Sequence, residues 1–410
     1  MQIGIHSEIG HLQKVIVHTP GREMSLVNPE LKDELLFDDI IFEEDARQEH
    51  LDMLKLFEAA MPDNGEIIEI LDLARVVFNS SDGRAYFVEQ LVESLPEKNI
   101  HLVEKKLKKL SADELLQFVV EGALKPVTDF TLWPLPNLLF TRDLAAVAGN
   151  NVIVSKAAKK ARTRESLLMK TILRFHPLFD EVRENIIEID PHQTIEGGDV
   201  LIVNEKLVLI GMSERTSFTG LLSISESLLN RGIEHVVVVD IPKKRSSMHL
   251  DTIFTFADKD ECIVFPPAIE ERTDNVVVLS QSGETIRAEK MPTLKQTLEE
   301  LCGHPYSFIK CGGSDQMDQY REQWTDGANV FALAPGVIVG YERNTKTFNA
   351  LIDHGYRYMN QFEFIEEYGD SPFNPEVEGK IAVTFQGHEL CRGRGGARCM
   401  TMPILRDKLN

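Results

Sequence analysis

The sequence predicts an α/β fold in which a strand–strand–helix–strand unit recurs about five times. Two observations indicate this class. Four segments share one pattern, a polar residue followed by two short apolar strands around a tight polar turn, and they begin at Asp143, Asp199, Asp251 and Asn329. After three of these hairpins apolar residues recur at three- and four-residue spacing, which predicts helices in TRESLLMKTILRF, GLLSISESLLNRG and PTLKQTLEELCG.

The hairpins follow one another along most of the chain. HLQKVIVHTPGR, near the N-terminus, resembles a degenerate first copy. The clearer copies are DLAAVAGNNVIVSK, DVLIVNEKLVLIGMSERT, DTIFTFADKDECIVFPP and NVFALAPGVIVGYERN. Because each copy is too small to bury its own apolar face, we expect the copies to pack side by side around a shared core.

A helical region interrupts this repeat. From about Ser80 to Lys125 apolar residues recur at helical spacing in YFVEQLVESL, HLVEKKLKKL and SADELLQFVVEGAL, and SADE resembles a capping box. We therefore expect residues 74–126 to form an inserted helical subdomain. Residues 1–73 and 127–410 are then the two parts of the repeat domain, and the second part carries the C-terminal cysteine loop.

Composition excludes several classes of protein. The 410 residues are 43% hydrophobic and 27% charged, which is an ordinary globular balance. The 65 acidic residues outnumber the 44 basic ones, which argues against nucleic acid or an anionic membrane as a partner. We find neither an apolar stretch long enough to span a bilayer nor a secretory pattern at the N-terminus. The five cysteines are not in CxxC pairs, so we expect free thiols and a cytoplasmic location.

Acidic side chains recur at the starts of successive units. The motifs FTRD, IEGGD and MHLD supply Asp143, Glu196, Asp199, His249 and Asp251. If the units close into a ring, equivalent strand ends meet at one mouth, where the loop CRGRGGARCM would add Cys399. A thiol, an imidazole and several carboxylates are the groups that a covalent cysteine mechanism needs.

A purely structural role or a metal site could account for the same residue types. A lone Asp before a strand is usually a turn residue, and an isolated Cys or His is usually packed in the core. Recurrence in three successive units favours a shared site instead. His, Asp and Glu could also hold zinc or manganese, but HxD lacks the two-His spacing of common zinc enzymes. We therefore expect neither a metal nor another cofactor.

Ordered motifs along most of the chain resemble the arginine deiminases, a family of the guanidine-modifying pentein superfamily. These motifs are SEIGHLQKVIVHTPGRE, ELLFDDIIFEEDARQEH, PNLLFTRD, IEGGDV, MSERT, MHLDT, REQWTDGANVFALAPGVIVGYERN and RGRGGARCMTMPI. The resemblance implies a five-bladed α/β propeller, the pentein fold, built from ββαβ-type repeats. It also implies hydrolysis of L-arginine to L-citrulline and ammonia through a covalent amidino-cysteine intermediate, without a cofactor.

The resemblance also implies roles for individual residues. Cys399 would be the nucleophile, His249 the general acid and base, and Glu196 the residue that orients His249. Asp143 and Asp251 would hold the substrate guanidinium, since carboxylates match its fork of N–H donors. The substrate-binding set would be Asn137, Phe140, Arg162, Asp199, Arg215 and Arg394, in which the arginines bind the α-carboxylate.

Several alternatives stay open on the sequence alone. The same cysteine could serve an amidinotransferase or a deiminase for another guanidino compound, and a metal-dependent hydrolase or a non-catalytic binding protein are further possibilities. The family pattern differs at Leu144 and at Arg398. FEFIEEYGDSPFNPEVEGKIAVTF is a long connection that could be a lid, an oligomer contact or a channel wall. We expect a homo-oligomer.

Overall fold

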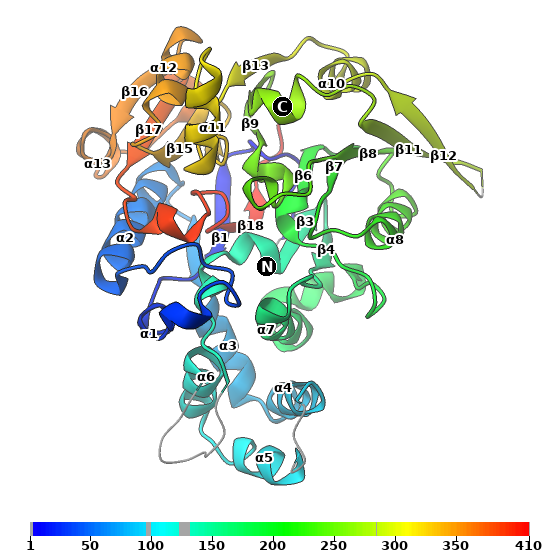
Figure 1. Ribbon diagram of the computed structural model, residues 1–410, viewed down its shortest axis with the longest axis vertical. Helices are drawn as coiled ribbons and strands as arrows, with labels where there is room; N and C mark the ends of the chain where they lie inside the picture. The colour runs from blue at the N-terminus through cyan, green and yellow to red at the C-terminus, as the bar shows by residue number, and fades with distance from the viewer. Residues whose placement is uncertain (1–2, 96–99, 123–131, 284, 410) are drawn as a thin grey trace.

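The computed structural model describes residues 3–95, 100–122, 132–283 and 285–409, and within them the strands form five separate sheets (Figure 1). One sheet contains β1 (Leu12–Val17), β2 (Glu66–Glu69) and β18 (Met402–Arg406). The next contains β3 (Ala145–Ala148), β4 (Asn151–Val154) and β5 (Ile186–Ile187). The third contains β6 (Val200–Asn204), β7 (Leu207–Met212), β8 (His235–Asp240), β11 (Val276–Ser282) and β12 (Thr285–Met291). The other two contain β9 (Phe254–Asp258), β10 (Glu261–Val264) and β13 (Ser307–Lys310), and β14 (Phe331–Ala334), β15 (Val337–Tyr341), β16 (Arg357–Asn360) and β17 (Ile381–Phe385).

The predicted repeat unit is present in four of these sheets. The four hairpins are the antiparallel pairs β3–β4, β6–β7, β9–β10 and β14–β15. The second strand of each hairpin then pairs in parallel with a later strand, giving β4–β5, β7–β8, β10–β13 and β15–β17. The helices on these crossovers are α7 (Thr163–Phe175), α8 (Phe218–Leu229), α10 (Leu294–Cys302), α12 (Thr345–Asp353) and α13 (Gln361–Tyr368). A parallel crossover needs such a helix to return the chain to the same edge of the sheet.

Strands from opposite ends of the chain form the remaining unit. β1 pairs in parallel with β2, and α2 (Glu43–Ala60) connects them. β1 also pairs antiparallel with β18, so that Ile16 lies opposite Met402. The predicted degenerate hairpin at the N-terminus is therefore wrong in detail, because the antiparallel neighbour of β1 comes from the C-terminal end. The isolated segment HLQKVIVHTPGR could not reveal a partner so distant in sequence.

One hairpin was not predicted. β11 and β12 pair antiparallel over their whole length, and β11 continues the sheet of the preceding unit by pairing with β8. This hairpin projects from the body at the right of Figure 1. The small helix α9 (Pro266–Ile269) precedes it, so the connection between β10 and β13 is longer than the simple repeat suggested.

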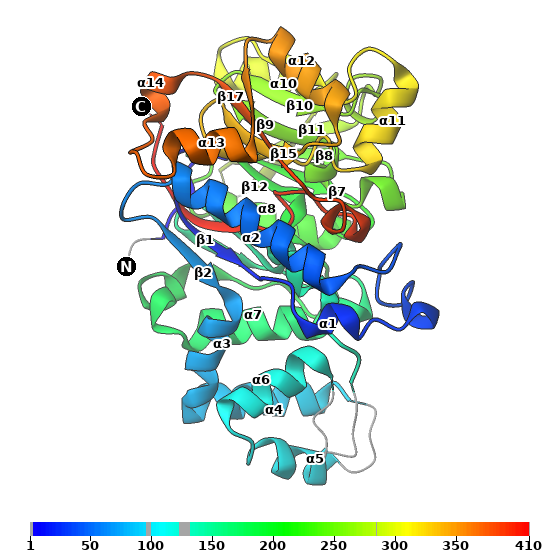
Figure 2. The same ribbon diagram turned by 90° about the vertical axis from the view of Figure 1, so that its left-hand side faces the viewer.

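Four helices gather at one end of the molecule (Figures 1 and 2). They are α3 (Ile70–Asn79), α4 (Ser81–Glu93), α5 (Ile100–Leu107) and α6 (Ala112–Glu121). Helical structure thus begins at Ile70, ahead of the expected position 74, and residues 123–126 lie outside the described residues. Ser111 and Glu114 form the expected capping box. Phe78, Phe87 and Phe118 are buried in one apolar cluster with side chains of α7, which attaches these helices to the body.

The long connection near residue 370 packs against the body. α13 contacts α2, and Phe364, Tyr368 and Phe373 form an aromatic cluster beneath it. α14 (Pro375–Glu378) then leads into β17. The remaining short helices are α1 (Arg22–Ser25) and α11 (Gln316–Trp324). In the described parts of the chain, no helix combines the length and the apolar character that crossing a bilayer requires.

Three short 3-10 turns carry the site residues that the sequence predicts. They lie immediately before the first strands of three units, at Thr141–Leu144, Gly197–Asp199 and Leu250–Thr252. The first turn contacts the second, and the second contacts the third. The predicted convergence of the unit starts is therefore confirmed for these three motifs.

Candidate active site

A small buried pocket lies where these turns meet the C-terminal loop. Its lining comes from several units and comprises Leu36, Asn137, Phe140, Asp143, Arg162, Arg215, Arg245, Met248, His249, Gly393, Arg394 and Cys399. The enclosed volume is about 20 Å³, which is space for about one water molecule. A larger molecule can enter only if some of these side chains move apart.

Close backbone packing holds Cys399 at the end of the C-terminal loop. Its N–H donates to Asn329 Oδ1 at 3.1 Å, and its carbonyl accepts from the Arg142 N–H at 3.1 Å. Gly395 lies so close that a Cβ atom there would come within 2.4 Å of the Phe140 ring and 3.0 Å of the Cys399 Cβ. Arg394 has φ of 66°. The glycines around the cysteine are therefore required by space, because a side chain at residue 395 would displace the thiol.

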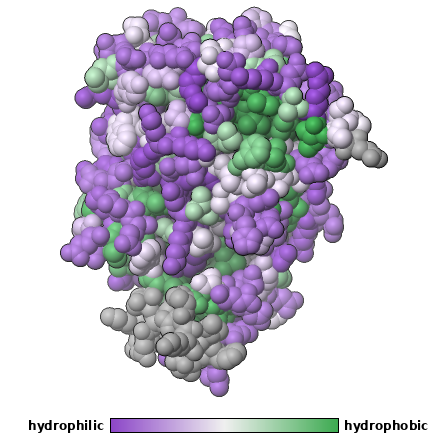
Figure 3. Space-filling view, turned by 45° about the vertical axis from the view of Figure 1, so that its right-hand side comes forward, coloured by the Kyte–Doolittle hydropathy of each residue, from purple (hydrophilic) through white to green (hydrophobic). Residues whose placement is uncertain are grey.

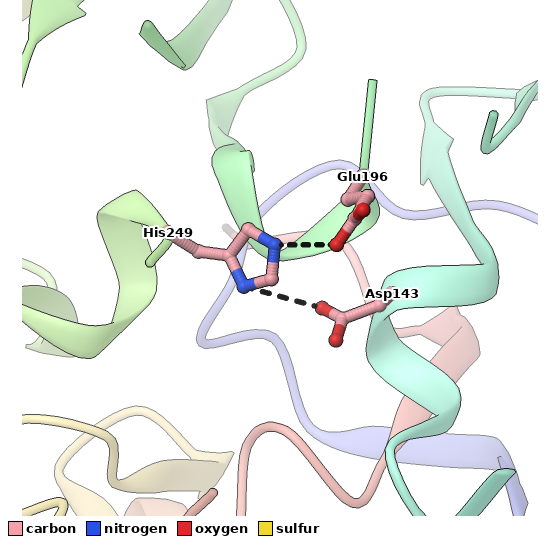
Figure 4. Close-up of side chains that lie close together, drawn as sticks. All are labelled: Asp143, Glu196 and His249. Carbon is pink, nitrogen blue, oxygen red and sulfur yellow. Dashed lines mark hydrogen bonds and ion pairs between the residues drawn. The ribbon is translucent and has the colours of Figure 1, made fainter. Parts of the chain in front are cut away.

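His249 lies between two carboxylates, as Figure 4 shows. Its Nε2 donates to Glu196 Oε2 at 2.9 Å, and its Nδ1 lies 3.5 Å from Asp143 Oδ1. Glu196 is held in turn, because its Oε1 accepts from the Ala158 N–H at 3.0 Å. All three side chains are buried. This arrangement fixes the orientation of the imidazole ring, which is the role predicted for Glu196.

The electrostatics favour a protonated histidine beside a neutral thiol. Burial lowers the pKa of His249, but the charge of Asp143 and the hydrogen bond to Glu196 outweigh it and raise the pKa to about 10. Burial, followed by the negative charges of Asp251 and Asp143, raises the pKa of the Cys399 thiol well above its ordinary value. At neutral pH the site thus holds an imidazolium ready to donate a proton and a thiol that needs a nearby positive charge to ionise.

Each of the two predicted guanidinium-binding carboxylates has one oxygen without a donor. Arg162 Nη1 donates to Asp143 Oδ2, and Arg398 Nε donates to Asp251 Oδ2 at 3.2 Å. Among the described residues, Asp251 Oδ1 has no hydrogen-bond donor, and Asp143 Oδ1 makes no hydrogen bond but lies 3.5 Å from His249 Nδ1. Asp251 does not line the pocket, but its carbonyl accepts from Asn329, the residue that binds the Cys399 backbone. Each carboxylate therefore keeps one oxygen that makes no hydrogen bond, and the charges of both act on the Cys399 thiol.

Arg394 presents unfilled donors on the same pocket. Its guanidinium lies over the ring of Trp324, 3.7 Å from the ring centroid, and its Nε is 3.8 Å from Asp38 Oδ2. The side chain is buried, yet within the described residues Nε and Nη1 have no hydrogen-bond acceptor. A buried cation with free N–H groups is a recognition site for a carboxylate.

The other two predicted arginines line the pocket but already have protein partners. Arg162 donates to Asp143 and Glu165, and also to the carbonyl oxygens of Asn137 and Phe140. Arg215 lies 3.1 Å from Glu214 and 3.8 Å from Glu196. In the arrangement observed, both arginines organise carboxylates of the site, and Arg394 alone of the three offers unpaired buried N–H groups.

Asn137 and Phe140 line the pocket as expected, whereas Asp199 lies behind it. Asn137 donates from its side chain to the Leu35 carbonyl at 2.7 Å, and the Phe140 ring packs against Gly395. Asp199 is absent from the pocket lining. It accepts from the hydroxyls of Ser213 and Thr216, both at 2.6 Å, and from the Leu250 N–H at 2.9 Å. Asp199 thereby anchors the turn that follows His249.

Sequence reasoning missed several residues of the site. Arg245 lines the pocket, donating to Asp38 and to the Leu36 carbonyl, and Met248 lies beside it. Asn329 had a usable signal, because it starts the fourth hairpin at the position that Asp occupies in the other units. Arg398, which pairs with Asp251, had no comparable signal.

Asp143, Glu196 and His249 are close enough together to hold a metal ion, with one ligand atom from each within 4.8 Å of the others. Two observations disfavour a dication there. Arg162 and Arg215 already place positive charge beside the two carboxylates. In addition, a histidine that carries a proton on both nitrogens cannot be a ligand, and the raised pKa of His249 favours that form.

Comparison with known proteins shows the family to which the chain belongs. The family model for arginine deiminase matches residues 120–406. The chain belongs to the arginine deiminase family. A relative named arginine deiminase, from Bacillus cereus (strain ATCC 10987 / NRS 248), is 34% identical over 435 aligned positions that cover 99% of each chain.

Solved structures agree on the fold. The N-terminal domain of ArgZ, an arginine dihydrolase from cyanobacteria solved with bound substrate, superimposes with a TM-score of 0.54 at 15% identity, covering 97% of this chain and 99% of that one. DDAH from Pseudomonas aeruginosa in complex with citrulline gives a TM-score of 0.52 at 14% identity, covering 96% and 100%. The chain therefore has the α/β pentein fold.

Proposed function

We propose that the protein hydrolyses L-arginine to L-citrulline and ammonia through an amidino intermediate on Cys399. One observation carries the proposal. The buried site offers unfilled acceptors on Asp143 and Asp251 near the thiol, and unfilled donors on Arg394. Free arginine has a guanidinium at one end and a carboxylate at the other, which matches this division of charge. Family membership supports the same activity.

Substrate binding promotes ionisation of the neutral Cys399 thiol. A guanidinium held by Asp143 and Asp251 cancels the negative charges that raise the pKa of Cys399, and so promotes loss of the thiol proton to water. The thiolate then forms a bond to the guanidinium carbon. His249 donates its extra proton to the departing nitrogen, which leaves as ammonia, and a cationic amidino-thioether remains.

The second half of the reaction returns the site to its starting state. Neutral His249 accepts a proton from a water molecule as that water attacks the amidino carbon. The carbon–sulfur bond breaks, and the thiolate leaves. The protonated citrulline oxygen then loses its proton, a proton returns to the thiolate to restore the neutral thiol, and citrulline is released. Glu196 and Asp143 stabilise the imidazolium that is regenerated, because they flank both ring nitrogens.

The test of this function is incubation of the purified protein with L-arginine. Citrulline and ammonia should form in equal amounts, and the rate should be unchanged in excess EDTA. An amidinotransferase would instead give little ammonia and a product that depends on an added acceptor amine. Loss of the activity in EDTA would contradict the cysteine mechanism and favour a metal-dependent hydrolase.

We also propose that the five sheets are the blades of a closed five-bladed propeller around this pocket. The pairing of β1 with β18 supports closure, because it builds the fifth unit from the two ends of the described chain. Residues 1–73 and 127–410 then form one domain, and 74–126 form an inserted helical subdomain that contacts it through α7. Replacing the insert by a short linker should leave a folded β-containing domain, measurable by circular dichroism.

We propose further that the protein is a cytoplasmic homo-oligomer without a nucleic-acid or membrane partner. The five cysteines are free, as a reducing compartment favours. β12 ends its sheet, so its outer edge has no strand beside it. Ile286 on β12 and Phe218 and Leu222 on α8 are exposed, and Figure 3 shows an apolar patch beside the projecting hairpin. Light scattering after gel filtration measures the oligomeric state directly.

A further inference from the structure

A second cavity, larger than the active-site pocket, lies between the helical insert and the body. It has a volume of about 380 Å³. α4 and α7, which contact each other, both contribute residues to its lining. Its lining comprises Gln90, Leu91, Glu93, Ser94, Val154, Ser155, Lys156, Ala157, Thr163, Arg164, Ser166, Leu167, Lys170, Glu188, Ile189 and Pro191. None of these residues lines the active-site pocket.

Two polar groups in this cavity lack partners. Ser155 is 4% exposed, and its hydroxyl has no hydrogen-bond partner among the described residues. The Nε atom of Arg164 is likewise buried without an acceptor, although its Nη2 donates to the Trp133 carbonyl. Buried polar groups are almost always hydrogen-bonded, so an unpartnered hydroxyl and an unpartnered guanidinium N–H on residues that line one cavity indicate that something should bind there.

The charge of the cavity favours an anion. Its lining includes three cations, from Lys156, Arg164 and Lys170, and two carboxylates, from Glu93 and Glu188. Lys170 neutralises Glu188 at 2.7 Å, and Glu93 is exposed and accepts from Gln90. Burial lowers the pKa of Arg164 to about 10, so its guanidinium stays charged at neutral pH. Lys156 is exposed, and neither Lys156 nor Arg164 forms a salt bridge among the described residues, although the charge of Glu165 acts on Arg164. The net charge of the whole chain is −21.

Two further features define the ligand. Thr163 and Arg164 begin α7, whose N-cap has no side-chain hydrogen bond, and the positive end of a helix dipole adds to the attraction for an anion. The rest of the wall is apolar and consists of Leu91, Val154, Ala157, Leu167, Ile189 and Pro191. We infer that this cavity is a binding site for a small organic oxyanion, with its phosphate or carboxylate group on Arg164, Lys156 and Ser155 and its apolar part against this wall.

The cavity is separate from the active-site pocket, but residues 155–158 support both. The Ser155 N–H donates to the Leu144 carbonyl, directly after Asp143. Lys156 pairs through its backbone with Ile195, directly before Glu196, and the Ala158 N–H binds the Glu196 carboxylate. A ligand here therefore does not compete with arginine, and any effect it has on turnover is transmitted through residues 155–158.

Phenyl phosphate is a suitable probe, because it joins an oxyanion to an apolar ring. Isothermal titration calorimetry of the wild-type protein should show one bound phenyl phosphate per chain and no binding of neutral phenol. Arg164→Leu and Lys156→Met should each weaken binding at least tenfold. Arg287→Leu, which removes an exposed arginine from β12, is the matched control and should bind as wild type does. The inference does not depend on turnover, since binding is measured directly.

Benzoate and steady-state kinetics complete the test. Stronger binding of phenyl phosphate than of benzoate assigns the phosphate group, and the reverse order assigns the carboxylate. At saturating phenyl phosphate the KM for L-arginine should be unchanged. A KM that rises in proportion to phenyl phosphate would mean that the probe occupies the active site and would overturn the inference. Unaltered binding in both Arg164→Leu and Lys156→Met, or equal binding of phenol, would overturn it too.

Discussion

Two buried histidines, His249 in the active site and His18 between β1 and α1, each lie between two carboxylates. Their surroundings differ. His18 Nδ1 lies 2.9 Å from Glu69 Oε1, and its Nε2 lies 3.1 Å from Glu23 Oε1. Its two hydrogen bonds to these carboxylates raise the pKa of His18 to about 9 in spite of burial. An imidazolium between two carboxylates therefore occurs twice in the molecule.

The difference lies in the unused hydrogen-bonding capacity. Around His18, the backbone N–H groups of Thr19 and Gly21 also donate to the two glutamates. Around His249, the Asp143 oxygen that lies 3.5 Å from Nδ1 makes no hydrogen bond, and Cys399 lines the same pocket. A satisfied ion pair stabilises the fold, whereas an ion pair with unfilled atoms beside a nucleophile can bind and change a substrate.

The largest expected effect is at the nucleophile. Cys399→Ala should lower kcat by roughly 10⁴-fold or more, because no other group in the pocket can form the covalent intermediate. Cys391→Ala, in the same C-terminal region, is the control and should keep activity. Denaturing mass spectrometry of the wild-type protein during turnover should show an amidino adduct on the peptide containing Cys399. Normal turnover by Cys399→Ala would end the covalent mechanism.

The paired histidine variants test the comparison itself. His249→Gln should lower kcat by roughly 10²–10⁴-fold, since it removes the proton donor. His18→Gln should leave kcat nearly unchanged but lower the free energy of unfolding by about 3–5 kcal/mol, because the buried Glu23 and the partly buried Glu69 lose their counter-charge. Steady-state assays and urea denaturation of both variants measure the two effects. Equal loss of activity in both would show that the two histidines are not functionally distinct.

A substrate that lacks the α-carboxylate tests the role of Arg394, whose N–H groups are the unfilled donors of the pocket. Agmatine lacks the α-carboxylate, so kcat/KM for agmatine should be lower than for arginine by on the order of a thousandfold, because Arg394 stays unpaired. Arg394→Met should lower kcat/KM for arginine strongly and for agmatine little, which narrows the ratio between the two substrates. An unchanged ratio in this variant would mean that another group binds the carboxylate.

The smallest effect expected is the pH dependence of stability. The folded-state pKa values of His249 and His18 are about 10 and about 9, both above the unfolded value near 6.5. Their stabilising contribution is therefore complete below pH 6.5 and is lost as pH rises through 9 and 10. The free energy of unfolding of the wild-type protein should fall over this interval, and His18→Gln should flatten the earlier part of the fall. The kcat should also fall above pH 10, where His249 loses the proton it donates.

The sequence repeat predicted where the turns lie better than it predicted where their side chains point. Asp143, Asp199 and Asp251 start equivalent units, and the structure brings their turns together. Their side chains nevertheless differ, because hydroxyls from the MSERT segment bind Asp199 and draw it away from the pocket. Local sequence fixes where a turn forms, but the partner that orients its side chain comes from another element.

Contacts between distant segments could not be predicted from the sequence either, because the partners come from different elements. Arg398 donates to Glu8, and Arg394 stacks on Trp324, pairs that exist only once the units have assembled. β11 and β12 were missed because VVVLSQS and TIRAEKM lie outside the repeat pattern used to find the other hairpins. Family resemblance supplied the roles of the central residues, whereas the cavity between α4 and α7 had no motif to reveal it.

The pairing of β1 with β18 has a consequence for the timing of activity during synthesis. Cys399 lies just before β18, and β18 is held by β1, the strand that leaves the ribosome first. The nucleophile therefore reaches the finished carboxylates and histidine only after translation has passed every other strand named above. Until residues 399–406 have been translated, the site therefore lacks both its thiol and the strand that pairs with β1.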